Sequence, residues 1–384
     1  MAGETTVILG GGVGGLVTAN ELRKRLGREH RVVLVDRERR HIFWPSLVWI
    51  QVGLRKPDKV GRNLATLQKK GIDVIHGEVD AIDPTRKTVS VDGQELAADY
   101  LVISLGAELA PERVPGLSET GYNLYTLAGA EAICNDRKKL DEGRLVVLTA
   151  GVPYKCPAAP YEAAMLLDHD LRKRKLRDRV DVAVYAWEPT PMGVAGPDVS
   201  AGVKQMLIDR NISYHPEHQI TRVDAVARTL HFASGAEVSF DFLVYIPPHV
   251  APTVVRKAGL TGESGWVPVD QHTMETKASG VYAIGDVTGI PLAIGMPLPK
   301  AGVFAHHEGE AVARTVASRI TGKGRPATFN GHGECFIEVG GGKAGFGRGN
   351  FYAEPRPTVK LRGPNRYWHV GKVLYEKDWF RRWF

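Results

Sequence analysis

A cysteine lies where the second half of the chain would be expected to carry a nucleotide-binding loop. The apolar run 145–149 is followed by the segment 151–162, which holds Cys156 between a lysine and a proline. A second dinucleotide site would need a glycine-rich turn at this point. Thiolates are redox-active nucleophiles, and a nearby cation and a helix N-terminus lower the pKa of a thiol. We therefore expect thiol chemistry at Cys156, with Lys155 lowering its pKa and Glu162 as the nearest group for proton transfer.

The chain has two further cysteines, Cys134 and Cys335. Three widely spaced cysteines form neither a disulfide framework nor a zinc site with paired ligands, so we predict no metal site. Long-range redox pairing of two of them stays open. Cys134 lies in the segment 128–139, which has the pattern of an amphipathic helix, and we interpret it as a structural residue.

The N-terminus carries an intact dinucleotide fingerprint formed by Gly10, Gly12 and Gly15. It lies between a predicted strand at residues 7–10 and a predicted helix at 16–26, and the following strand, 31–36, ends on Asp36. Such glycines permit a tight turn and a close approach of the backbone to a pyrophosphate, and the acidic residue accepts hydrogen bonds from a ribose. This context predicts that the first half binds one dinucleotide.

The order of predicted strands and helices indicates an α/β protein with two Rossmann-like dinucleotide-binding domains, the second degenerate. We place the first domain at residues 1–113 and 280–335, and the second, which carries Cys156, at 114–279. A helix is predicted at about 303–320. Residues 336–384 form a separate C-terminal region.

The C-terminal region ends in aromatic residues interleaved with Lys and Arg. Five of the last eighteen residues are Trp or Phe, a pattern that fits an amphipathic segment lying in a membrane interface. The alternative is a helix that packs on the protein itself or on a second subunit, so a homo-oligomer stays open. The chain has no apolar run long enough to span a bilayer and no secretory signal, which predicts a peripheral (monotopic) membrane protein.

Composition adds little about partners. The 384 residues are 43% hydrophobic, and 50 Lys and Arg against 43 Asp and Glu give a net charge of +7. This balance suits an anionic substrate or anionic lipid headgroups, and we predict no nucleic-acid partner.

The segment Tyr154-Lys-Cys156-Pro-Ala-Ala-Pro-Tyr-Glu162, together with the N-terminal fingerprint, resembles the two-dinucleotide-domain flavoproteins of the glutathione-reductase type and, within them, the sulfide:quinone oxidoreductases. The similarity extends over nearly the whole chain. Its other parts are the segments 100–106, 280–286, 299–302, 335–336 and 372–375.

The resemblance implies that FAD binds the first domain, with Asp36 on the adenosine ribose and Asp286 near the ribityl and pyrophosphate groups. Trp44 and Pro45 are expected close to the flavin ring, and Lys300 is expected near the flavin, where it could stabilise the anionic reduced form. The family resemblance assigns these cofactor-binding residues in full: Gly10, Gly12, Gly15, Asp36, Trp44, Pro45, Gly106, Gly285, Asp286 and Lys300.

The resemblance also implies that Cys156 and Cys335 form a disulfide or a sulfur-bridged pair on the face of the flavin opposite the quinone. Hydrosulfide would attack one sulfur of the pair, and the electrons would pass through FAD to a membrane quinone. Phe336, Lys372 and Tyr375 match the residues that form the quinone pocket in this family. The C-terminal segment is then the membrane and quinone segment.

Three other functions share parts of this pattern. The flavoprotein subunit of flavocytochrome c sulfide dehydrogenase has a similar cysteine site, but it passes electrons to a haem subunit and is exported. A type II NADH:quinone dehydrogenase has the same fold and membrane habit, but it needs a second glycine-rich fingerprint. A flavin-bound sulfur carrier or redox sensor would use the cysteines without turnover.

Overall fold

The first unit of the molecule is built on a parallel five-stranded sheet in the order β20-β9-β1-β2-β5. The computed structural model describes residues 3–384. The strands of this sheet are β1 (Thr5–Leu9), β2 (Arg31–Asp36), β5 (Asp73–His76), β9 (Tyr100–Ile103) and β20 (Val281–Ala283). The central strands β9, β1 and β2 bury most of their residues because both faces of a parallel sheet are covered.

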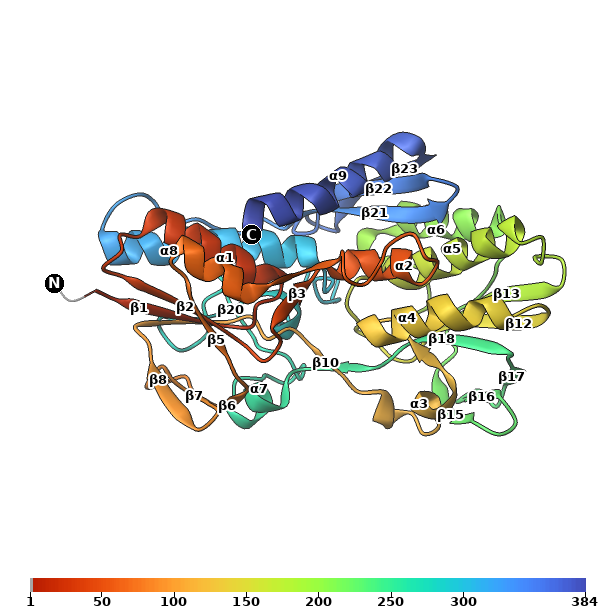
Figure 1. Cartoon of the computed structure of the whole chain (residues 1–384), viewed down its shortest axis with the longest axis horizontal. Coiled ribbons are helices and arrows are strands. Elements are labelled where there is room, and N and C mark those ends of the chain that lie inside the picture. Colours follow the sequence, from red (N-terminus) through yellow and green to blue (C-terminus); the bar gives the residue numbers. More distant parts are fainter. Residues whose placement is uncertain (1–2) are drawn as a thin grey trace.

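Helices α1 (Val13–Arg25) and α8 (Gly302–Thr321) lie side by side on one face of this sheet (Figure 1). The antiparallel sheet β6-β7-β8 covers the other face, where its valines share one core with those of β1 and β2. The strands of the covering sheet are β6 (Val79–Asp83), β7 (Thr88–Val91) and β8 (Gln94–Ala97). The first unit also contains the short elements β3 (Arg40–Ile42), α2 (Leu47–Ile50) and β4 (Gly61–Asn63).

The second unit repeats this plan with a five-stranded sheet in the order β11-β18-β12-β13-β14. Its strands are β11 (Tyr122–Asn123), β12 (Gly143–Thr149), β13 (Val180–Tyr185), β14 (Ser213–His215) and β18 (Phe242–Ile246). Strands β12, β13, β14 and β18 take the places that β1, β2, β5 and β9 hold in the first sheet. The prediction of two Rossmann-like units is therefore confirmed.

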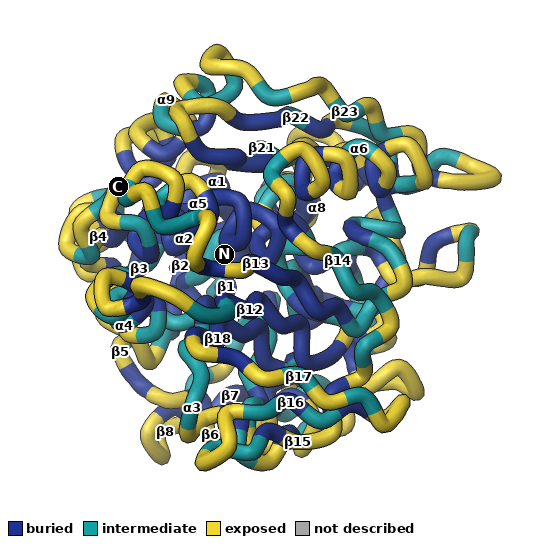
Figure 2. The backbone as a smooth tube through the Cα atoms, turned by 90° about the vertical axis from the view of Figure 1, so that its right-hand side faces the viewer, coloured by how far each residue is buried: buried dark blue, intermediate teal, exposed yellow. Residues whose placement is uncertain are grey.

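Helices cover one face of the second sheet and a small antiparallel sheet covers the other. The helices are α4 (Leu127–Asp136), α5 (Ala159–Lys173) and α6 (Pro197–Ile208). The small sheet and the short helix beside it consist of β15 (Ile220–Asp224), β16 (Thr229–Phe232), β17 (Glu237–Ser239) and α3 (Leu117–Thr120). Figure 2 shows the buried tube of β12 and β13 in the interior, with exposed segments at the rim.

The chain returns to the first unit upstream of the predicted boundary at residue 280. The paired strands β10 (Glu108–Leu109) and β19 (His249–Val250) connect the two units, and α7 (Thr253–Lys257) then packs on β6. Val255 and Val267 are buried in the core of the first sheet. The predicted boundary was wrong because residues 251–279 form no regular strand pattern that would reveal their packing partner.

The C-terminal region begins within the segment assigned by sequence to the first domain. Strands β21 (His332–Gly340), β22 (Lys343–Asn350) and β23 (Thr358–Asn365) form an antiparallel sheet, and Cys335 lies inside β21. Strand β21 packs on α5 of the second unit. Helix α9 (Arg366–Trp383) lies over this sheet and reaches α1 of the first unit (Figure 1).

The aromatic side chains at the C-terminal end of α9 pack on the protein, contrary to the predicted interfacial position. Trp379, Phe380 and Trp383 are buried, and the indole of Trp379 donates to Nε2 of His41 at 3.0 Å. The apolar residues that α9 does expose form a different set: Tyr367, Val370, Leu374 and Tyr375. Within residues 3–384, none of the helices combines the length and the apolar character needed to cross a bilayer.

Candidate functional site

The loop between β12 and α5 holds Cys156 in a fixed position. Its backbone has a φ of +52°, in the left-handed region that costs a non-glycine residue roughly 1 kcal/mol or more. The amide of Cys156 donates to the carbonyl of Lys300 at 2.7 Å. The hydroxyl of Tyr125 donates to the carbonyls of Lys155 and Cys156 at 2.6 and 3.0 Å. These bonds from both units compensate the strain of the loop.

The fold brings Cys335 to the same place. Strand β21 lies against α5, whose first turn follows Cys156 directly, and both cysteines are half-buried free thiols. The Cys335 thiol donates to the carbonyl of Phe336 at 3.2 Å. Burial raises the pKa of Cys335 well above its ordinary value, and the charges of Cys156 and Glu162 raise it further. The two sulfurs therefore share one electrostatic environment, although they are far apart in the sequence.

The predicted lowering of the Cys156 pKa is wrong. Burial raises the pKa of Cys156 to about 12, the carboxylate of Glu162 adds to the rise, and Lys372 opposes it. The ammonium of Lys155 lies over the ring of Trp44, 4.7 Å from its centroid. Since a thiol with this pKa stays protonated at neutral pH, the reduced cysteines are weak nucleophiles. The arrangement suits a disulfide that an external nucleophile attacks.

A buried ion pair lies beside the two thiols. The Lys372 ammonium on α9 donates to Oε1 of Glu162 at 2.8 Å, and both side chains are at most 5% exposed. Burial lowers the pKa of Lys372, but Glu162 and Glu338 raise it more, so its pKa lies above the ordinary value. Lys372 also lies 4.8 Å from the centroid of the Trp49 ring. The pair joins a residue predicted for proton transfer to one predicted for quinone binding.

Sequence reasoning missed two residues of this site. Glu338 is 1% exposed, and its backbone amide donates at 2.9 Å to the same Oε1 of Glu162 that Lys372 binds. Nδ1 of His369 lies 3.0 Å from both carboxylate oxygens of Glu338. The available signal was the position of Glu338, three residues after Cys335, although only the fold reveals its contact with Glu162.

The turn between β1 and α1 leaves open space at the carboxyl end of β1. A Cβ on Gly15 would lie 1.9 Å from the carbonyl oxygen of Gly10, so only glycine permits helix α1 to start this close to the strand. A Cβ on Gly12 would meet nothing within 4 Å. The start of α1 therefore presents free backbone amides to an open space, as a pyrophosphate requires.

The predicted acidic residues lie at the same edge. Asp36 accepts from the amide of Gly11 through Oδ2, and burial raises its pKa. Burial also raises the pKa of Asp286, which Lys155 and Lys300 lower in turn. Oδ1 of Asp286 is buried without a hydrogen-bond partner among residues 3–384. An unpartnered buried acceptor of this kind fits the hydroxyl of a bound dinucleotide. Gly106 and Gly285 follow the neighbouring strands β9 and β20.

Lys300 holds the backbone together and does not project freely toward the cleft. Its ammonium donates to the carbonyls of Asp286 and Thr288 at 2.7 and 2.9 Å and lies 3.3 Å from the centroid of the Trp266 ring. Burial lowers the pKa of Lys300 to about 8. Trp44, by contrast, is 39% exposed and begins a short turn with Pro45.

The two aromatic residues predicted to bind quinone pack in different clusters of side chains. Phe336 packs against Phe346, with ring centroids 5.1 Å apart, whereas Tyr375 packs against Phe43 at 5.9 Å. Tyr375 is 40% exposed. Phe336 is next to Cys335 and lies against Gly371, the neighbour of Lys372, so it is the ring nearer to the thiols.

The second unit has filled the site that would bind a second dinucleotide. Glu188 follows β13, the counterpart of the strand that ends on Asp36. Its carboxylate accepts hydrogen bonds from the hydroxyls of Thr149, Tyr154 and Tyr161. Both tyrosines are buried. The acidic group that a ribose would need is therefore already engaged, and aromatic side chains occupy the cleft.

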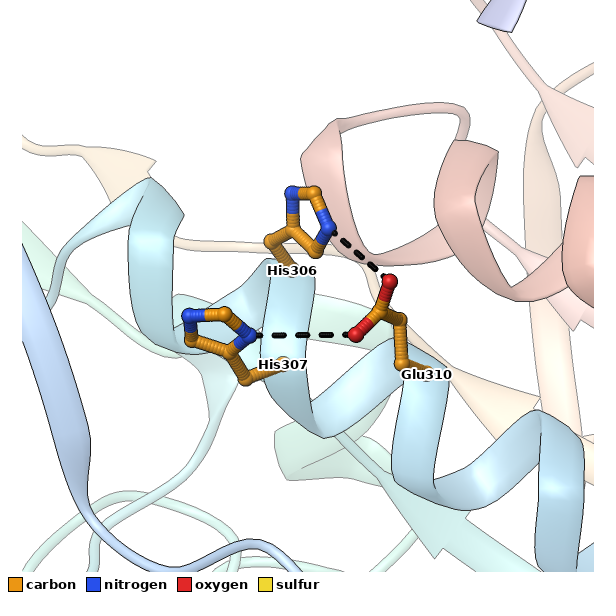
Figure 3. Close-up of side chains that lie close together, drawn as sticks. All are labelled: His306, His307 and Glu310. Carbon is orange, nitrogen blue, oxygen red and sulfur yellow. Dashed lines mark hydrogen bonds and ion pairs between the residues drawn. The ribbon is translucent and has the colours of Figure 1, made fainter. Parts of the chain in front are cut away.

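A cluster of side chains on α8 contacts the C-terminal end of α9. His306, His307 and Glu310 place their ligand-type atoms within 4.8 Å of one another (Figure 3). Arg382 from α9 donates to Oε1 of Glu310 at 3.3 Å. The His306 ring lies edge-on to Trp383 at 5.5 Å. Because Arg382 already neutralises the carboxylate of Glu310, we interpret the cluster as a structural contact that holds the two helices together.

Comparisons with known proteins agree with this geometry. Residues 4–309 match the family model described as pyridine nucleotide-disulphide oxidoreductase. The chain is 28% identical to the sulfide-quinone reductase of Aquifex aeolicus, over 97% of this chain and 89% of that protein. It is 24% identical to the mitochondrial sulfide:quinone oxidoreductase of Mus musculus, over 92% and 79%.

Among solved structures, the X-ray structure of the sulfide:quinone oxidoreductase from Aquifex aeolicus superimposes with a TM-score of 0.90. It covers 99% of this chain and 91% of its own, at 24% identity. This similarity confirms the predicted α/β fold. With four-fifths of its length matched by the family model, the chain belongs to the pyridine nucleotide-disulphide oxidoreductase family.

Proposed function

We propose that this protein is a sulfide:quinone oxidoreductase that uses FAD and the Cys156–Cys335 pair. The observation that carries the proposal is the convergence of two distant cysteines on one buried Glu162–Lys372 pair. The relatives that match over most of the chain carry this activity in their names.

The residues of the first cleft fit FAD. The open space at Gly12 and the amides at the start of α1 would hold the pyrophosphate, and Asp36 would bind the ribose. Asp286, with its unpartnered buried oxygen, would bind the ribityl or pyrophosphate portion. When bound, FAD accepts an electron pair from sulfur and passes it on to a quinone.

The cysteine pair performs the sulfur chemistry. Hydrosulfide attacks one sulfur of the disulfide, which breaks the S–S bond and leaves a persulfide on one cysteine and a thiolate on the other. Burial and the charge of Glu162 disfavour that thiolate. The site therefore promotes loss of two electrons and the persulfide proton, after which the cysteines are bridged by one additional sulfur. Glu162 is the carboxylate placed to take the proton.

Lys372 and Phe336 would contribute to the quinone pocket. The ammonium of Lys372 would polarise a quinone carbonyl, and the ring of Phe336 would pack on the quinone. Tyr375, which is half-exposed on α9, would line the outer part of the pocket.

The exposed stripe of α9, which comprises Tyr367, Val370 and Leu374, would attach the protein to the membrane. These residues recur at the spacing of one helix face, and Leu54 adds an exposed side chain from the loop whose Arg55 bonds to Glu376 of α9. Leu374→Glu should weaken binding to anionic lipid vesicles about tenfold in a sedimentation assay. Unchanged binding would remove the stripe from the proposal. Val226→Glu, at a 97% exposed residue of the second unit, is the control.

Anaerobic titration of the purified flavoprotein with sulfide tests the whole function. Sulfide should bleach the flavin absorbance, and decylubiquinone should then restore it. If NADH bleaches the flavin and sulfide does not, the protein is a NADH dehydrogenase. If soluble cytochrome c reoxidises the flavin and quinone does not, it is the flavocytochrome type.

A further inference from the structure

The reaction proposed above leaves one proton unaccounted for. Oxidation of hydrosulfide to bridged sulfur releases two electrons and one proton, whereas reduction of a quinone to a quinol consumes two of each. The balance is HS⁻ + H⁺ + quinone → bridged sulfur + quinol. One proton per turnover must therefore reach the buried site from water.

Glu338 and His369 form a chain of groups from the surface to this site. The His369 side chain is 24% exposed, and its Nδ1 lies 3.0 Å from both oxygens of the Glu338 carboxylate. That carboxylate is 1% exposed, and it acts on Lys372 as a nearby charge. Lys372 in turn binds Glu162 at 2.8 Å. Titratable groups thus follow one another from solvent to the thiols.

Burial of these titratable groups costs more free energy than a purely structural contact requires. Two carboxylates, Glu162 and Glu338, lie in the interior near the single ammonium of Lys372, which binds Glu162 and acts on Glu338 only as a nearby charge, and an excess buried charge destabilises the fold. Burial raises the pKa of Glu338, which Lys372 and His369 lower in turn. A carboxyl whose pKa is raised takes up a proton more readily, which relieves the excess negative charge, so the network is suited to hold a proton in transit.

We propose that Glu338 and His369 are a proton inlet, which passes a proton from water to Lys372 and from there to the quinone. This inference rests on the proposed function and adds two residues to it. Other titratable or charged groups around the inlet are Cys335 on the same strand, His169 of α5, which lies against Gly340, and Arg210, which follows α6 and donates to the carbonyl of Val339. His169 and Arg210 lie at the far end of β21, beyond Glu338.

Stopped-flow measurement of the two half-reactions tests the inlet. Glu338→Gln keeps the shape of the side chain and removes its proton. It should slow quinone-driven reoxidation of the reduced flavin by about 100-fold, the scale of a lost acid–base group. Bleaching by sulfide should stay within about twofold of wild type. Equal slowing of both half-reactions, or no slowing of either, would overturn the proposal.

A second variant guards against a folding defect. His369→Gly opens the inlet to solvent, and reoxidation should fall about tenfold and recover as imidazole is added to the buffer. Lack of recovery would argue that His369 is merely structural. The matched control is Glu310→Gln, which removes a carboxylate that contacts His306 within α8 and Arg382 of α9 without touching the inlet. It should leave both half-reactions and their pH profiles unchanged.

A measurement without turnover completes the test. Dicyclohexylcarbodiimide modifies protonated carboxyl groups, and mass spectrometry of the resting protein locates the modified residue. Modification of Glu338, whose pKa is raised by burial, should increase as the pH falls, whereas Glu310, whose pKa is lowered by His306 and His307, should stay unmodified. If Glu338 labels no more than Glu310, the inlet is wrong. Failure of wild type to bleach with sulfide would instead refute the proposed function.

Discussion

The two Rossmann-like units have the same strand order, but the same edge of the sheet is open in the first unit and filled by side chains in the second. In the first, glycines at the β1–α1 turn keep the edge open, and the acidic residue Asp36 faces the cleft. In the second, the turn after β12 holds Cys156, and tyrosines fill the cleft and bind Glu188. The comparison teaches that a duplicated scaffold changes function through the residues of one loop while the sheet beneath it stays the same.

The sharpest way to break this comparison is to remove a sulfur of the cysteine pair. Cys156→Ser or Cys335→Ser should reduce the rate of flavin bleaching by sulfide at least about 1,000-fold, because each cysteine is needed for the exchange. The flavin should stay bound in both variants. Cys134→Ser is the control, since this thiol contacts Arg137 away from the site. A variant of Cys156 or Cys335 with wild-type bleaching would refute the role of the pair.

The next largest effect concerns the ion pair that links α9 to the second unit. Lys372→Met leaves the buried carboxylate of Glu162 without its cation and should lower the free energy of unfolding by about 3–5 kcal/mol in a denaturant titration. The double variant Glu162→Gln/Lys372→Met should recover part of this loss. Arg381→Met removes an exposed pair with Asp378 on the same helix and should cost little. An equal cost for both lysine and arginine variants would contradict the buried arrangement.

The first unit handles its buried carboxylate differently. Glu308 accepts from the amide of Gly285 at 2.6 Å, and burial raises its pKa to about 7. A carboxyl with a raised pKa binds more protons when folded, so its contribution to stability is lost as the pH rises from about 4.5 to about 7, by about 3 kcal/mol. Glu308→Gln should remove this slope from thermal unfolding measured across that range. An unchanged slope would assign it to other groups.

The smallest effect compares one glycine in each loop. Gly15→Ala places a Cβ 1.9 Å from a backbone oxygen, and it should cost about 1–3 kcal/mol and leave the purified protein without flavin. A Cβ on Gly151 would meet Pro248 at 3.3 Å, so Gly151→Ala should cost less than about 1 kcal/mol and retain the flavin. Flavin absorbance per protein after purification distinguishes the two.

The sequence predicted the parts of the molecule that depend on local pattern. Apolar strands, the helix at 303–320 and the N-terminal fingerprint follow from spacing alone, and the fold class is confirmed. Contacts between distant segments could not be predicted. The Glu162–Lys372 pair, the role of Glu338 and the packing of Trp379 against His41 all depend on where α9 lies.

The pKa of Cys156 was mispredicted for a related reason. Its sequence neighbour Lys155 suggested a stabilised thiolate, but that ammonium lies over Trp44, and burial together with Glu162 determines the result. Sequence proximity indicates which charges are near along the chain. It does not reveal how much water is excluded around a group, and here the exclusion of water has the larger effect.

The placement of Cys335 on β21 and of Lys372 on α9 has a consequence for biosynthesis. Both residues leave the ribosome after the two sheets are complete. A nascent chain can therefore form its nucleotide site before Cys335, the second cysteine of the pair, has been made. During that interval Glu162 has no cation, and the half-made protein is inert toward sulfide. Translation thus delivers the reactive centre last, once the scaffold that contains it is already in place.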